Sequence, residues 1–195
     1  MSSSVDIANQ ALMMVGSKPI VSFEDNTTEA NIMATAYQQT KASVLRMHEW
    51  GCSTKVETLA LLEAAPTDTY WHYAYAMPKQ AIRITDVFTN GIDYYNRREW
   101  QVEVQDESKV IVSRIPNAIA RFTYDVPESR LDAHVEALLV ARLAFDFAYA
   151  LTGSNTRESN LGSIYMERLK EARTTDNLEG SHTGFRIDTL QNVRY

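Results

Sequence analysis

The chain has 195 residues, 45% hydrophobic and 23% charged, a composition that predicts a folded protein with a substantial core. Its net charge of -6 disfavours any function that depends on neutralising DNA phosphates, because such proteins carry a surplus of Lys and Arg. The single cysteine, Cys52, excludes an internal disulfide and is expected to be a small buried hydrophobe beside Trp50. Residues 1–20 lack a secretory signal pattern, and no apolar run approaches the roughly 20 residues of a membrane span, so a soluble protein is expected.

Two helices are predicted at the start of the chain. In the first, apolar residues recur every three or four positions, with Ser4 expected to cap the start and Gly16 the end. Asn26, followed three residues later by Glu29, resembles a capping signal for a longer helix over residues 27–48. The apolar face of the longer helix comprises Ala30, Met33, Tyr37, Val44 and Met47.

The middle of the chain changes to the periodicity of strands. Residues 54–62 fit either a strand or a short helix. Asn90-Gly91 suits a tight hairpin turn, and residues 106–108 suit a second turn. Four short segments rich in β-branched or aromatic residues are predicted to be antiparallel strands: 82–88, 100–105, 109–114 and 119–125.

Residues 71–78 place four aromatic rings and Pro78 within eight positions. Tyr and Trp combine a large apolar body with a polar tip, so such a segment suits a dry surface, either in a core or at a subunit interface. Because Pro78 leads directly into the predicted strand 82–88, we expect most of these rings to pack the strand-rich region onto the helices.

Helical periodicity returns after Pro127. A broad apolar stripe over residues 129–151, followed by Gly153, predicts the strongest helix of the chain. A last helix is predicted over residues 156–173. The final stretch, residues 176–195, mixes polar and spaced apolar residues and is predicted to be an extended arm.

This order of elements predicts an α+β fold. Residues 1–52 and 127–175 are expected to form a discontinuous bundle of about four helices. Residues 53–126 are expected to form an inserted antiparallel β-meander that projects from the bundle.

No constellation in the sequence predicts catalysis. The chain contains no glycine-rich phosphate loop. The histidines are too scattered for a close metal-ligand spacing, so no metal and no cofactor is expected at His48, His72, His134 or His182.

Two alternatives from other functional classes stay open. A peptidoglycan hydrolase requires two carboxyls across the scissile bond, for which Glu57 with Glu63, or Asp132 with Glu136, are the candidate pairs. The four-residue spacing of the second pair favours a solvated helix face instead. A nucleic-acid-binding module would use the stacking residues Arg97, Arg98 and Trp100.

Several segments together resemble the tail tubular protein A, or head-to-tail adaptor, family of short-tailed bacteriophages. The resemblance depends on the order and spacing of these segments, because each one by itself is mainly a hydrophobic pattern. They cover most of residues 5–175 and comprise 11–20, 45–50, 71–78, 82–84, 138–151 and 161–172.

The resemblance implies a structural protein of the virion and no enzyme. It implies a ring of twelve identical subunits at the head-tail junction, docked beneath the portal protein and carrying the tail nozzle. Genomic DNA would pass through the bore without sequence-specific binding, which suits an acidic subunit. A ring needs two different faces per subunit, and an arm that folds on a neighbour secures one of them. The expected partner-binding residues of the arm are Phe185, Arg186, Ile187, Leu190 and Tyr195.

Overall fold

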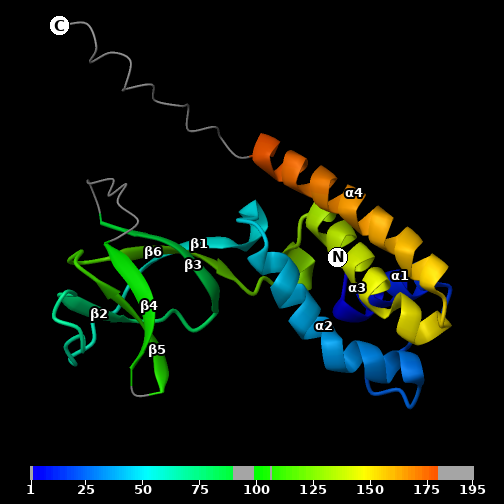
Figure 1. The fold of residues 1–195 in the computed structure, drawn as a ribbon, viewed down its shortest axis with the longest axis horizontal. Coiled ribbons are helices and arrows are strands. Elements are labelled where there is room, and N and C mark those ends of the chain that lie inside the picture. The colour runs from blue at the N-terminus through cyan, green and yellow to red at the C-terminus, as the bar shows by residue number, and fades with distance from the viewer. Residues whose placement is uncertain (1, 90–98, 106, 180–195) are drawn as a thin grey trace, which may run out of the picture.

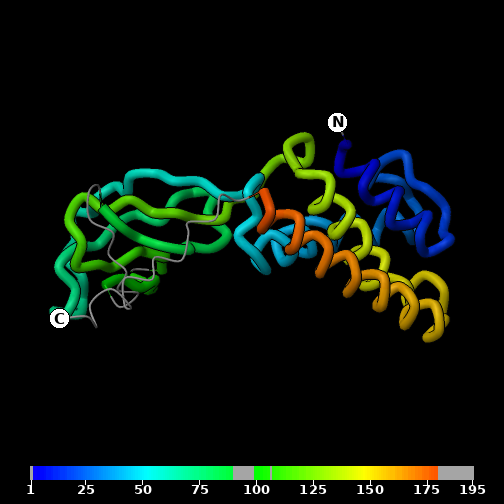
Figure 2. The backbone as a smooth tube through the Cα atoms, turned by 90° about the horizontal axis from the view of Figure 1, so that it is seen from above, coloured from blue at the N-terminus to red at the C-terminus, as the bar shows by residue number. Residues whose placement is uncertain are grey.

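The computed structural model of the protein describes residues 2–89, 99–105 and 107–179. Within these residues, four α-helices gather in one lobe and six strands in the other (Figure 1). Figure 2 shows the lobes joined at a narrow waist, which the chain crosses at residues 47–53 and again at residues 125–132. The predicted α+β fold with about four helices is therefore confirmed.

Helix α1, Ser4–Val15, is capped at both ends by local interactions. The N-cap is Ser3, one residue before the predicted Ser4, because the Ser3 hydroxyl accepts from the Asp6 amide while the Asp6 carboxylate accepts from the Ser3 amide. Gly16 ends the helix as expected, in the left-handed conformation with φ 81°.

Helix α2, Thr28–Arg46, buries the face that the sequence predicts, although both of its ends differ from the prediction. Its N-cap is Thr27 and not Asn26, since the Thr27 hydroxyl accepts from the Ala30 amide. The helix stops before His48, and Met47 is only partly buried.

The strands form two antiparallel sheets of three strands each. The first has the order β1-β6-β3, with bounds Thr54–Thr58, Ile119–Tyr124 and Ala81–Phe88. The second has the order β2-β5-β4, with bounds Tyr73–Ala76, Ser108–Ser113 and Trp100–Gln105.

The β-meander prediction was wrong. The predicted strands β5 and β6 are consecutive but lie in different sheets, so the chain crosses between the sheets at residues 114–118. The reason is that β2, which the sequence analysis did not identify as a strand, occupies the edge of β5 opposite β4. The predicted turn at Asn90-Gly91 and the first residue of the turn at 106–108 lie outside the described residues.

The aromatic segment 71–78 packs mainly within the strand lobe. The Tyr75 hydroxyl donates to the Ile115 carbonyl at 2.7 Å and accepts from the Ala118 amide, which ties β2 to the crossing between the sheets. Trp71 belongs to a small apolar cluster that contains no helical residue, so the expected packing onto the helices is wrong for this ring. The members of that cluster are Trp71, Ala74, Val110, Val112 and the partly buried Leu62.

Helix α3, Ala133–Thr152, is the central helix and packs against α1, α2 and α4. It begins four residues later than predicted, because a short 3₁₀ turn, Glu128–Arg130, precedes it and the backbone at Leu131 and Asp132 is extended. It ends at Gly153, also in the left-handed conformation.

Helix α4, Asn155–Glu179, runs back along α3 toward the waist (Figure 1). It continues six residues beyond its predicted end, so residues 176–179 of the expected arm are helical. Burial of Asp176 explains the extension, because this residue makes contacts at the waist that a polar arm would not make.

The larger apolar cluster among the described residues extends through both lobes. It contains Leu138 and Leu143 of the central helix together with Ile111 of β5 and Phe122 of β6. The strand lobe is therefore packed against the helices at the waist and is not merely tethered to them.

Lys41 contributes a polar link at the waist. Its side chain is only 3% exposed, and its ammonium lies 2.8 Å from Asp125 and 3.1 Å from Glu128, both on the second crossing of the chain. A charge buried to this extent is tolerated because both carboxylates pair with it.

We expect Lys41→Met to destabilise the protein by about 2 kcal/mol, because a charge-assisted hydrogen-bonded pair is lost and Glu128 is left without its partner. Urea unfolding measures the change. Lys170→Met removes an exposed lysine of α4 and should change stability by less than about 0.5 kcal/mol. Equal effects of the two substitutions would contradict a structural role for Lys41.

Gly16 is constrained twice, by its positive φ and by the Arg157 side chain. A Cβ at this position would lie 2.6 Å from Arg157 Nη1, and this guanidinium donates to the Val15 carbonyl. Gly153 has a similar φ of 64°, but a Cβ there would meet open space. We expect Gly16→Ala to cost about 2 kcal/mol and Gly153→Ala about 1 kcal/mol in the free energy of unfolding, which urea denaturation measures. Equal costs would show that the Arg157 contact contributes nothing.

Candidate functional site

Trp50 is the centre of the waist and is fully buried. It follows the end of α2, and its indole nitrogen donates to the Val44 carbonyl at 3.0 Å. Its own carbonyl accepts from the Ser53 amide and the Thr54 hydroxyl, which fixes the path of the chain into β1. The ring thus anchors the first crossing between the lobes.

Two histidines flank the Trp50 ring and face one carboxylate of α4. His48 lies edge-on to the indole with ring centroids 4.7 Å apart, and its Nε2 is 3.0 Å from Asp176 Oδ2. His134, at the start of α3, has its Nε2 3.7 Å from Asp176 Oδ1. The same Oδ1 accepts from the Gly51 amide at 2.9 Å. Asp176 therefore joins α4 to both the first crossing and the start of α3.

Two further carboxylates complete this group. Asp132, His134 and Glu179 each offer one metal-ligating atom, and these atoms lie within 4.8 Å of one another. Asp132 is the N-cap residue of α3, yet its side chain makes no capping hydrogen bond. We call the set Asp132, His134, Asp176 and Glu179, with His48, the waist cluster.

The sequence analysis did not identify the waist cluster. His48 and His134 were noted, but their separation of 86 positions hides their convergence. Asp176 and Glu179 both lie within residues 176–195, which the sequence predicts to be an extended arm. No local apolar pattern marks the last turn of α4, because Leu178 is exposed there and the buried residue is Asp176.

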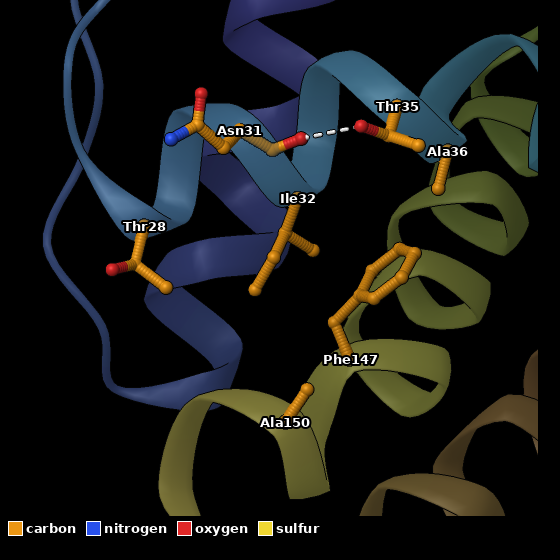
Figure 3. Close-up of a pocket in the computed structure, with 7 residues that line it drawn as sticks. All are labelled: Thr28, Asn31, Ile32, Thr35, Ala36, Phe147 and Ala150. Carbon is orange, nitrogen blue, oxygen red and sulfur yellow. Dashed lines mark hydrogen bonds between the residues drawn. The ribbon is translucent and has the colours of Figure 1, made fainter.

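A second feature is an apolar groove between α2 and α3, with a volume of about 470 Å³. Figure 3 shows Ile32 and Phe147 pointing into this space from the two helices. Its polar groups are few, and the Thr35 hydroxyl is already bonded to the Asn31 carbonyl. The full lining is Thr28, Asn31, Ile32, Thr35, Ala36, Phe147 and Ala150. The groove suits an apolar contact better than a reaction.

The candidate carboxylate pairs are not built as a hydrolase requires. Glu57 and Glu63 are both exposed, so neither lies in the dry, apolar surroundings in which a glycosidase holds its catalytic acid. Glu136 accepts from the Ser2 hydroxyl at 2.7 Å and from Gln10, whereas Asp132 faces the waist cluster. The second pair is therefore divided between two different surroundings.

Several other predicted residues lie outside the described part of the chain. They are Arg97 and Arg98 of the nucleic-acid alternative, His182, and the arm residues Phe185, Arg186, Ile187, Leu190 and Tyr195. Trp100 is described, on β4, where it packs partly buried against the core. One side of the Trp100 ring therefore contacts the protein core and is not free to stack on a base.

Comparison with known proteins adds no assignment, since no protein-family model and no curated protein matches the chain. Among the described residues, none of the helices combines the length and the apolar character needed to cross a membrane. The functional argument therefore depends on the residues themselves.

Cys52 lies beside the waist cluster and is partly buried, less completely than expected. Burial raises the pKa of its thiol to about 11, and the negative charges of Asp132 and Asp176 act in the same direction. At pH 8 the thiol is therefore protonated and a poor nucleophile.

We expect alkylation of Cys52 by iodoacetamide at pH 8, with a chelator present, to be on the order of 100-fold slower in the folded than in the urea-unfolded protein. Because the folded pKa is raised, the thiol's contribution to stability is fully present below its unfolded pKa of roughly 8.5. That contribution is lost as the pH rises from there through about 11. Equal alkylation rates would contradict the raised pKa.

Proposed function

We propose that the protein is the head-to-tail connector of a short-tailed bacteriophage, a ring subunit between the portal protein and the tail nozzle. The order and spacing of the segments that resemble tail tubular protein A carry this proposal. The resembling segments include the end of α1, the Trp50 region, the aromatic segment and helices α3 and α4. In this function the protein retains the packaged genome and passes it during ejection, without catalysis.

The distribution of apolar surface supports assembly with further copies of the same chain. Large apolar side chains are exposed on three helices, at Met13 of α1, Tyr149 of α3 and Met166 of α4. The apolar groove between α2 and α3 lies on the same lobe. A ring subunit needs two different contact faces, and apolar surface supplies most of the favourable free energy of such contacts.

The end of α4 supports a partner-binding arm. Leu178 is 73% exposed in the last turn of α4, so the apolar character that marks the arm begins before residue 180. The arm residues Phe185, Ile187, Leu190 and Tyr195 are spaced as apolar anchors, and Arg186 adds a charge for a polar contact. In our proposal this segment binds a neighbouring subunit or the portal.

The acidic character of the chain supports passage of DNA through such a ring. With a net charge of -6, the subunit lacks the Lys and Arg surplus that holds DNA by its phosphates. A bore lined by such subunits lets the polymer slide, and binding to free DNA should be negligible at physiological salt.

The proposal predicts a ring when the protein is mixed with the portal protein encoded in the same genome. Native mass spectrometry and negative-stain electron microscopy should show twelve copies of the 22.1 kDa chain, about 265 kDa, on one portal. If the mixture yields only separate components at every protein concentration and salt tested, the connector proposal is wrong.

Two sets of substitutions in the arm test whether the arm binds the portal. Replacing Phe185, Ile187 and Leu190 by Ser should abolish the portal complex, because the apolar anchors are lost. Replacing Thr189 and Gln191 by Ala should leave it intact. Circular dichroism and thermal unfolding confirm that both variants keep the two lobes folded. A ring that forms equally well with both variants would remove the arm from the interface while leaving the connector proposal standing.

A further inference from the structure

We infer that Asp132, His134 and Glu179 bind a divalent transition-metal ion of the zinc type at the waist. Their ligating atoms lie within 4.8 Å of one another and come from the start of α3 and the end of α4. A tetrahedral ion with bonds of about 2 Å holds its donors about 3.3 Å apart. Glu179 is exposed at the end of α4, so its side chain is free of packing constraints that would prevent it from approaching an ion.

His134 supplies an imidazole nitrogen that the described residues leave without a hydrogen bond. Its Nε2 is buried, and the nearest carboxylate oxygen, Asp176 Oδ1, is 3.7 Å away, which is too long for a hydrogen bond. A buried imidazole nitrogen without a partner is costly unless a ligand engages it. A metal ion bound at Nε2 would remove that cost.

The charge balance of the waist cluster also favours a cation. Asp132, Asp176 and Glu179 bring three carboxylates together, and within residues 2–89, 99–105 and 107–179 no Lys or Arg forms an ion pair with them. Asp176 and Glu179 lie in the last turn of α4, which contains no basic residue. The C-terminal end of a helix carries partial negative charge, so a dication at this position relieves repulsion from both sources.

The donor set selects the kind of metal. Imidazole together with carboxylates suits zinc and related transition metals, whereas Mg²⁺ and Ca²⁺ prefer oxygen ligands alone. His48 and the Gly51 amide hold Asp176, whose Oδ1 lies 3.7 Å from His134 Nε2 and adds negative charge beside the proposed site.

The inference does not depend on ring formation. A bound ion clamps the end of α4 to the start of α3, next to the Trp50 ring that lies 6.2 Å from His134. The ion would then fix the last turn of α4 against the start of α3.

Zn²⁺ alone, added to the chelator-stripped full chain, tests the site by isothermal titration calorimetry and thermal unfolding. We expect one ion per chain and a rise in Tm of several degrees at saturating zinc, because the ion binds only the folded state. His134→Ala and Glu179→Gln should each weaken binding at least about tenfold. His72→Ala removes an exposed imidazole in the other lobe and should leave the affinity unchanged.

Glu179→Gln is the decisive variant if His134→Ala fails to fold, because Glu179 is exposed at a helix end. The inference is overturned if the wild-type chain binds no zinc at about 100 µM free ion, the weak end of a useful site. It is also overturned if both ligand variants bind as tightly as the wild type, which would place the ion elsewhere.

Discussion

Burial of Trp50 at the waist is the constraint on which the rest of the structure depends. The chain must leave the helical lobe and return to it, and both crossings would otherwise expose apolar surface and unpaired backbone groups. The indole fills the first crossing and caps α2 through Val44, while Lys41 binds the carboxylates of the second crossing. Because these contacts are made by residues from both crossings, the two lobes share one core.

The same constraint extends α4 and determines where it ends. Asp176 reaches the backbone of Gly51 and the ring of His48, so the last helix is held against the first crossing until Glu179. A proposed partner-binding segment therefore begins at a fixed point of the molecule, beside the strand lobe.

Much of the fold follows from local patterns. The helices were predictable because apolar residues recur with helical spacing and the left-handed glycines Gly16 and Gly153 mark two of the ends. Four strands were predictable from β-branched residues. The end of α4 was not predictable, because the buried residue there is Asp176, which contacts Gly51 about 125 positions away. The order of the strands in the sheets was not predictable either. Strand β2 consists of alternating Tyr and Ala, and packing decides that it pairs with β5.

The sequence by itself determined the class of fold, the number of helices and the absence of a local catalytic motif, because these depend on composition and on spacing within each segment. Only the tertiary structure decided the pairing of the strands, the shared core and the waist cluster. His48, His134 and Asp176 are far apart along the chain and become neighbours only when α2, α3 and α4 pack around Trp50. Contacts of this kind are long-range, and no local pattern in one sequence encodes which distant residues will meet.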